Sequence, residues 1–138
     1  MYKRILVTLE TTPTDRVIID HIKQLAKFIQ SRVILLHVAT GVPAQWSGPE
    51  AGGKEIDEDK NYLAKIKKEF EETGVPVETV LAYGDPVQEI IKWVESNPCD
   101  LVAMSTHGHR LLGDILHGTT AIRVQHYVSV PVLLLRSK

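Results

Sequence analysis

The sequence predicts one α/β domain in which a doubly wound parallel sheet is covered by helices on both faces. Short apolar runs alternate along the chain with longer segments whose apolar residues recur at helical spacing, and such strands pair in parallel through right-handed crossovers. The run at residues 5–9 lacks polar–apolar alternation, as expected for a central strand buried on both faces. The 138 residues suffice for a single domain, residues 1–138, whose core needs no disulfide or metal ion to be stable.

The first half of the chain supplies two strands and two helices. Thr12 as N-cap, with Pro13 next and Asp15 three residues after the cap, predicts the start of the first helix. Its apolar face then recurs every three or four residues, and a second strand follows at residues 33–38. Residues 40–53 carry four glycines and two prolines and are expected to form a long connection. A helix over residues 54–73 should end at Gly74.

The second half supplies three more strands. Residues 75–83 have a proline, Pro76, near their start and are expected to form an edge strand, since proline has no N–H to donate to the hydrogen-bond ladder of a sheet. Gly84 makes a turn, and Asp85 caps a helix that runs to about Ser96. Residues 100–104 form a buried strand, residues 121–127 a helix and residues 130–135 the last strand.

Composition excludes several classes of protein. The formal net charge is −1, which gives no basis for a general nucleic-acid or membrane-surface partner. The apolar run near the N-terminus is too short for a signal peptide or a membrane span. The single cysteine, Cys99, excludes an intramolecular disulfide framework and fits a reducing compartment, so we expect a cytoplasmic protein.

A glycine-bearing loop follows the strand at residues 100–104. Ser105-Thr106-His107-Gly108 is separated by nine residues from Gly118-Thr119-Thr120, where we expect the next helix to begin. Exposed backbone N–H groups and the positive end of a helix dipole favour an anion, and hydroxyls add donors for phosphate oxygens. The alternative is that the glycines only shape a turn between a strand and a helix.

These residues carry a resemblance to the universal stress protein family. Nucleotide-binding members of that family have a Gly-x2-Gly-x9-Gly-(Ser/Thr) loop, which Gly108, Gly118 and Thr119 match, while Ser105 occupies the position of the first glycine. The similarity extends over nearly the whole chain. It implies a Rossmann-like fold of the adenine nucleotide alpha hydrolase type, with five strands in the order 3-2-1-4-5. Ligands of such sheets bind at the carboxyl ends of strands 1 and 4.

The resemblance implies that ATP or another adenine nucleotide is the ligand. Glu10 takes the place of an aspartate that reaches the ribose or adenine side, and Met104 lays apolar surface near the nucleotide. Ser105 is small and can donate a hydrogen bond, so it should change affinity rather than block the site. The residues expected to bind the nucleotide are Thr8, Leu9, Glu10, Val38, Met104, Ser105, His107, Gly108, His109, Gly118, Thr119 and Thr120.

The histidines of this loop are a weak metal pattern. His107, His109 and His117 lie within eleven residues, but no well-spaced set of ligands accompanies them. Histidine beside an anion acts more simply as a donor or a partial positive charge. We expect no intrinsic metal site and a divalent ion, Mg²⁺ or Mn²⁺, that arrives bound to the phosphates.

No residue of the sequence is identified as catalytic. The Gly-x4-Gly-Lys-(Ser/Thr) and Gly-x-Ser-x-Gly motifs are missing from the sequence, so any ATP hydrolysis or self-phosphorylation should be slow. Two functions remain open. One is a nucleotide-binding regulatory module of the stress response, and the other is a nucleotide-independent module that binds an unidentified protein partner. In both, the apolar strand from Val130 to Arg136 is expected to form a homodimer at the sheet edge.

Overall fold

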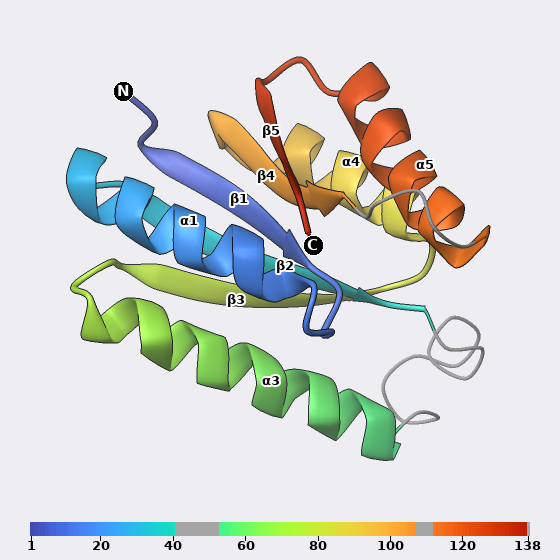
Figure 1. Cartoon of the computed structure of the whole chain (residues 1–138), viewed down its shortest axis with the longest axis horizontal. Helices are drawn as coiled ribbons and strands as arrows, with labels where there is room; N and C mark the ends of the chain where they lie inside the picture. The colour runs from blue at the N-terminus through green and yellow to red at the C-terminus, as the bar shows by residue number, and fades with distance from the viewer. Residues whose placement is uncertain (41–52, 107–111, 138) are drawn as a thin grey trace.

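The computed structural model of the chain describes residues 1–40, 53–106 and 112–137, with only the backbone described for residues 112–119. Strands and helices alternate throughout these ranges (Figure 1). In chain order the elements are β1 (Arg4–Leu9), α1 (Asp15–Ile29), β2 (Arg32–Ala39), α3 (Gly53–Glu72), β3 (Val77–Tyr83), α4 (Pro86–Ser96), β4 (Leu101–Thr106), α5 (Leu112–Tyr127) and β5 (Val132–Arg136).

The strands form one parallel sheet in the order β3-β2-β1-β4-β5. β1 lies at its centre, where Ile5 pairs with Val33 of β2 on one side and with Leu101 of β4 on the other. β3 and β5 are the two edges. The fold class and strand order expected from the sequence are therefore confirmed, and β3 is the edge strand that Pro76 indicated.

Two apolar cores fill the two faces of the sheet. Ile5 and Val7 of β1 point into the core beneath α1 and α3, whereas Leu6 points into the core beneath α4 and α5. Figure 1 shows α1 and α3 on one side of the sheet and α4 and α5 on the other. This period of two explains why the central strands are apolar at nearly every position.

Two helix ends follow the local signals in the sequence. Asp85 caps α4 by accepting a hydrogen bond from the Gln88 N–H at 2.9 Å. At the end of α3, Gly74 has a φ of +83°, its N–H donates to the Glu71 carbonyl, and the Val75 N–H donates to the Phe70 carbonyl. This pair of bonds is the Schellman motif, which requires a left-handed residue and so selects glycine. Because Val75 completes that motif, β3 begins at Val77 and not at residue 75.

The start predicted for α1 is wrong. The helix begins at Asp15, with Thr14 as an N-cap whose side chain makes no capping bond. Thr12 and Pro13 instead lie in a tight turn, in which the Asp15 N–H donates to the Thr12 carbonyl at 3.0 Å. The side chain of Asp15 reaches back to the backbone before this turn and fixes the chain there, so that the first turn of the helix is displaced along the chain.

The start predicted for α5 is also wrong. α5 begins at Leu112, so Gly118, Thr119 and Thr120 lie inside the helix and not at its N-terminus. A single glycine within a helix costs about 1 kcal/mol relative to alanine, which tertiary packing readily outweighs. Gly118 therefore does not form the helix N-terminus at which an anion was expected.

No helix among the described residues is long and apolar enough to cross a membrane.

Candidate functional site

A cleft of about 240 Å³ opens at the carboxyl ends of β1 and β4. These strands are neighbours, yet the helices that follow them cover opposite faces, because α1 packs over one core and α5 over the other. The two connections therefore diverge and leave a crevice at the point where the strand order reverses. Topology alone thus creates the cavity in which the candidate side chains meet.

The cleft combines apolar walls with polar groups. β1 and the turn after it contribute Thr8, Leu9, Glu10 and Thr12, and β2 with the residue after it contributes Leu36, His37, Val38 and Thr40. The remaining lining comes from α4, β4 and α5, through Pro86, Ile90, Met104, Ser105 and Thr120. Such an arrangement suits a flat apolar group that also carries hydroxyls or other hydrogen-bonding atoms.

Many of the expected binding residues meet in this cleft. Those that line it are Thr8, Leu9, Glu10, Val38, Met104, Ser105 and Thr120. His107, Gly108 and His109 lie outside the described residues. The backbone of Gly118 and Thr119 belongs to α5, two residues and one residue before Thr120, while their surroundings are not described.

Glu10 stands at the mouth of the turn that follows β1. One of its carboxylate oxygens accepts a hydrogen bond from the Thr14 hydroxyl at 3.3 Å, and Thr14 in turn shares a hydrogen bond with the Thr12 hydroxyl at 2.5 Å. A carboxylate and two hydroxyls thus gather on one turn. Together they offer both acceptors and donors to a polar ligand.

The backbone of this turn is held by Asp15, whose side chain is only 1% exposed. Its carboxylate accepts hydrogen bonds from the N–H groups of Glu10 and Thr11, both at 2.9 Å, and from the Tyr62 hydroxyl at 2.8 Å. Burial raises the pKa of this carboxyl, and the N–H and hydroxyl donors partly oppose that rise. From the sequence, Asp15 was expected only to start the helix, because a contact with Tyr62 across 47 positions leaves no local signal.

His37 is a cleft residue that the sequence analysis missed. Its Nδ1 lies 2.7 Å from the Leu9 carbonyl, which can only accept, so Nδ1 carries the hydrogen. Its Nε2 lies 3.5 Å from a carboxylate oxygen of Asp59 in α3. The available signal was the lone polar residue in the apolar run of β2, at the strand end that faces the cleft.

Ser105 has a buried hydroxyl oxygen with no hydrogen-bond partner in the part of the chain that the structure describes. A buried polar atom without a partner costs roughly 1–3 kcal/mol. Buried polar atoms are rarely left so, and the exceptions concentrate where a ligand or an ordered water completes the set. The hydroxyl therefore marks a position at which a bound molecule would gain a hydrogen bond.

A second, smaller cavity of about 150 Å³ adjoins the cleft and shares Glu10, His37 and Thr40 with it. Its other described lining includes the acidic residues Glu55 and Asp59. Among the residues that the structure describes, no three side chains of histidine, cysteine or acidic type are grouped so as to hold a metal ion.

Comparisons with known proteins agree on one family. The model of the universal stress protein family matches residues 1–136. Universal stress protein MJ0577 of Methanocaldococcus jannaschii is 30% identical over 157 residues, which cover 100% of this chain and 97% of that protein. The solved structure of MJ0577 has a TM-score of 0.84 at 32% identity, with 100% of this chain and 98% of that chain covered.

More distant structures share the fold. A universal stress protein in complex with cAMP has a TM-score of 0.73 at 16% identity and covers 97% of this chain and 96% of its own. One from Archaeoglobus fulgidus in complex with dAMP has a TM-score of 0.73 at 17% identity and covers 96% of this chain and 97% of its own.

Proposed function

The chain belongs to the universal stress protein family, and on that premise we propose that it binds an adenine nucleotide, ATP in the first place, in the cleft between β1 and β4. The observation that carries the proposal is the cleft itself, which lies at the switch point of the sheet and is lined by residues expected from the sequence. Solved relatives of the same fold hold cAMP and dAMP, both adenine nucleotides, which supports this ligand class.

The adenine ring would lie on the side of the sheet that faces α4. Val38, Ile90 and Met104 line the cleft and also belong to the core beneath α4 and α5, so they present an apolar wall that is already packed. The cleft volume of about 240 Å³ is slightly below the roughly 300–1,000 Å³ of most ligand pockets. It therefore suits the nucleoside part, with the phosphates extending outward.

The polar groups would orient the rest of the nucleotide. The Glu10 carboxylate is an acceptor at the cleft mouth and suits the ribose hydroxyls, as acidic residues do in related nucleotide folds. The phosphates would extend toward α5, where Thr120 lines the cleft, whereas contacts with Gly108, Gly118 and Thr119 and donors from His107 and His109 stay predictions from the sequence. Mg²⁺ or Mn²⁺ would be held by the phosphates and water, because such ions prefer oxygen ligands.

The biological role follows from the family. We propose that the protein is a stress-response regulator that acts as a homodimer. A protein partner would distinguish its nucleotide-bound state from its empty state. We assign no side chain as a catalytic base, so hydrolysis or self-phosphorylation, if it accompanies binding, should be far slower than the roughly 1–1,000 per second of ordinary enzymes.

Calorimetry on nucleotide-depleted protein tests the proposal. ATP, AMP and GTP should be titrated separately in the presence of Mg²⁺, and the adenine nucleotides should bind while GTP binds at least tenfold more weakly. Glu10→Gln removes the charge from the ribose contact and should weaken ATP binding by roughly three- to tenfold, since hydrogen bonds to charged groups contribute about 1.5–3 kcal/mol and the amide keeps part of that.

Glu78→Gln is the matched control. It removes the same charge from β3, but at the amino ends of the strands, opposite to the cleft. Its affinity for ATP should equal that of the wild type. An absence of binding by any adenine nucleotide up to millimolar concentration would instead favour the nucleotide-independent interaction module.

A further inference from the structure

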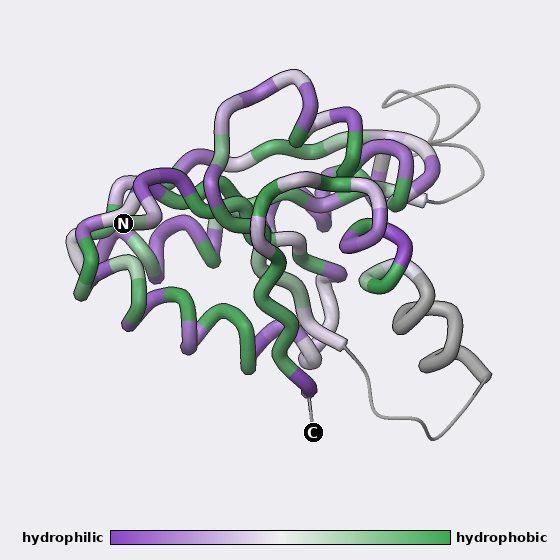
Figure 2. Tube along the Cα trace, turned by 90° about the horizontal axis from the view of Figure 1, so that it is seen from above, coloured by the Kyte–Doolittle hydropathy of each residue, from purple (hydrophilic) through white to green (hydrophobic). Residues whose placement is uncertain are grey.

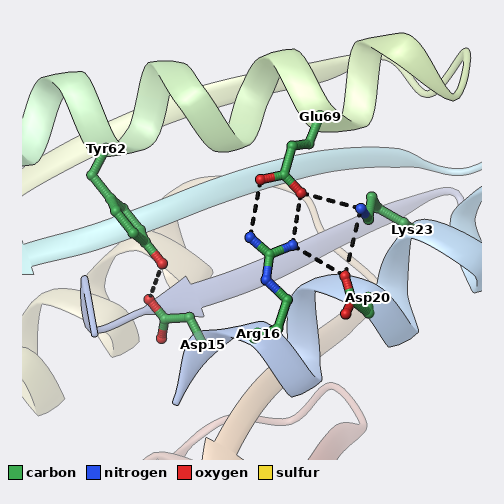
Figure 3. Close-up of polar contacts among 6 residues, drawn as sticks. All are labelled: Asp15, Arg16, Asp20, Lys23, Tyr62 and Glu69. Carbon is green, nitrogen blue, oxygen red and sulfur yellow. Dashed lines mark hydrogen bonds and ion pairs between the residues drawn. The ribbon is translucent and has the colours of Figure 1, made fainter. Parts of the chain in front are cut away.

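The buried carboxylate of Asp15 is surrounded by donors that belong to two distant parts of the chain. The N–H groups of Glu10 and Thr11 reach it from the turn after β1, and the Tyr62 hydroxyl reaches it from α3. Figure 3 shows Tyr62 extending from α3 to Asp15 at the start of α1. None of the described lysines and arginines forms an ion pair with Asp15, so the donors that compensate its burial within the described residues are neutral.

The same carboxylate stabilises an unusual backbone conformation. Thr11 has a φ of +62°, in the left-handed region that costs a non-glycine residue roughly 1–2 kcal/mol. The hydrogen bond from the Thr11 N–H to Asp15 offsets this cost and fixes the peptide that joins Glu10 to Thr11. Because the peptide groups on both sides of Glu10 are held, its side chain leaves the backbone at a set place beside the cleft.

We propose that Asp15 is a positioning residue of the nucleotide site, which holds Glu10 at the cleft, and that Tyr62 supports it from α3. The inference rests on the proposed function in that the partner of Glu10 is taken to be an adenine nucleotide. Asp15 and Tyr62 do not line the cleft. They act through Glu10. Their loss should therefore loosen the turn after β1 more than it affects the rest of the fold.

Tyr62→Phe is the sharpest test, because it removes one hydroxyl and keeps the ring that packs on the core beneath α1 and α3. Asp15→Asn removes the charge as a second variant. Glu69→Gln is the matched control, since Glu69 also joins α3 to α1 (Figure 3), while its hydrogen bonds within the described residues go to Arg16 and Lys23 and not to the turn. All three variants should lower the thermal midpoint of unfolding by a few degrees.

The first measurement needs no ligand. Hydrogen exchange followed by NMR should show the amides of Glu10 and Thr11 exchanging at least tenfold faster in Tyr62→Phe and Asp15→Asn, relative to the buried β2 amide of Leu35 as an internal reference. In Glu69→Gln the ratio should stay within about threefold of the wild type. Unchanged ratios in both loop variants would overturn the proposal.

The second measurement is ATP affinity in a double-mutant cycle. Tyr62→Phe should weaken binding three- to tenfold in the wild-type background and less than twofold in the Glu10→Gln background, because a residue that acts through Glu10 has no separate effect once that carboxylate is gone. Equal weakening in both backgrounds would contradict the inference. If the wild type binds no adenine nucleotide while the amides respond as expected, the proposed function fails and Asp15 remains the residue that holds Glu10.

Discussion

Ser105 is the main difference between this chain and the loop expected in nucleotide-binding members of its family. A glycine is expected here from the loop of the family's nucleotide-binding members, whereas in this chain a hydroxyl lies at the end of β4 with its oxygen buried and unpartnered among the described residues. An atom in that state destabilises the empty protein and favours any ligand that offers an acceptor or a donor. The same hydroxyl should therefore affect stability and binding in opposite directions.

Ser105→Ala tests this at the scale of one atom. Removal of the unpartnered hydroxyl should raise the free energy of unfolding of the empty protein by about 1 kcal/mol and weaken ATP binding several-fold, because a buried hydrogen bond contributes about 1 kcal/mol. Urea denaturation and calorimetry measure the two effects. Ser31→Ala is the control, since the buried Ser31 hydroxyl donates to the Tyr2 carbonyl and its loss should destabilise the protein. Destabilisation by both variants would show that Ser105 is satisfied in solution.

Single residues of the site were predictable where topology or a motif named them. Val38 and Met104 were expected from the resemblance to the family, and Glu10 from that resemblance and from the rule that ligands bind where parallel strands end; all three line the cleft. Asp15 and Tyr62 were not predictable as partners, because their contact joins two helices and depends on how α3 packs over α1. His37 is intermediate, since its position in β2 was visible but its bond to the Leu9 carbonyl was not.

At the scale of elements, α1 and α3 are joined by a charge network beside the contact of Asp15 with Tyr62. Glu69 accepts two hydrogen bonds from the Arg16 guanidinium, at 2.7 and 3.0 Å, and one from Lys23 at 3.1 Å. These cations, Arg16 first, lower the pKa of Glu69 to about 2 from its ordinary value of 4.5. A bidentate pair with a second cation is the geometry in which a surface ion pair contributes measurably.

The sign of the resulting pH dependence follows from that pKa. A depressed carboxyl pKa stabilises the fold above the unfolded value, and the contribution is lost as the pH falls toward the folded value. The free energy of unfolding of the wild type should thus exceed that of Glu69→Gln by about 1 kcal/mol at pH 7. This difference should shrink as the pH falls below 4.5 toward 2. Urea denaturation from pH 7 to 3 measures it. The exposed Glu78 carboxylate lies 3.4 Å from the Arg4 guanidinium, so Glu78→Gln should differ less from the wild type in its free energy of unfolding at every pH.

The starts and ends of helices were predictable where the sequence signal acts on nearby backbone groups. Asp85 caps α4 and Gly74 ends α3 as the sequence indicated, because each acts on backbone groups within five residues. The starts of α1 and α5 were misplaced. In α1 the side chain of Asp15 serves the preceding turn, and in α5 a glycine within the helix was taken for its beginning. In α1 the local preference of Thr12 and Pro13 was therefore weaker than the hydrogen bonds that Asp15 makes.

At the scale of the whole molecule, the two edges of the sheet differ. β3 carries Glu78 near its start, and a charge there opposes pairing with another chain. β5 carries no charge from Val132 to Leu135, and Figure 2 shows this last segment as hydrophobic until the hydrophilic residue near the C-terminus. Alternation of strands and helices predicted a parallel sheet from the sequence alone. The strand order came from the family resemblance, because register between distant strands leaves no local pattern.

The backbone groups of β5 divide into an inner and an outer set. The Pro131 carbonyl accepts from the Val102 N–H and the Ser137 N–H donates to the Thr106 carbonyl, so these odd-numbered residues face β4. Successive residues of a strand alternate in the direction of their N–H and C=O groups. The groups of Val132 and Leu134 therefore point away from β4. We propose that these groups pair with the same strand of a second copy across a two-fold axis.

Val132→Lys tests that homodimer. A two-fold axis places each substitution in the interface twice, so a lysine at the open edge adds like charges and should convert a dimer into a monomer. The side chain of Val132 packs partly on the core beneath α4 and α5, and the lysine stem can cover that surface with its charge in water. Val132→Thr keeps the branched shape without the charge and should remain a dimer. Sedimentation velocity at micromolar concentration measures the mass, and circular dichroism verifies the fold. A monomeric wild type, or a folded lysine variant that stays dimeric, would exclude pairing through β5.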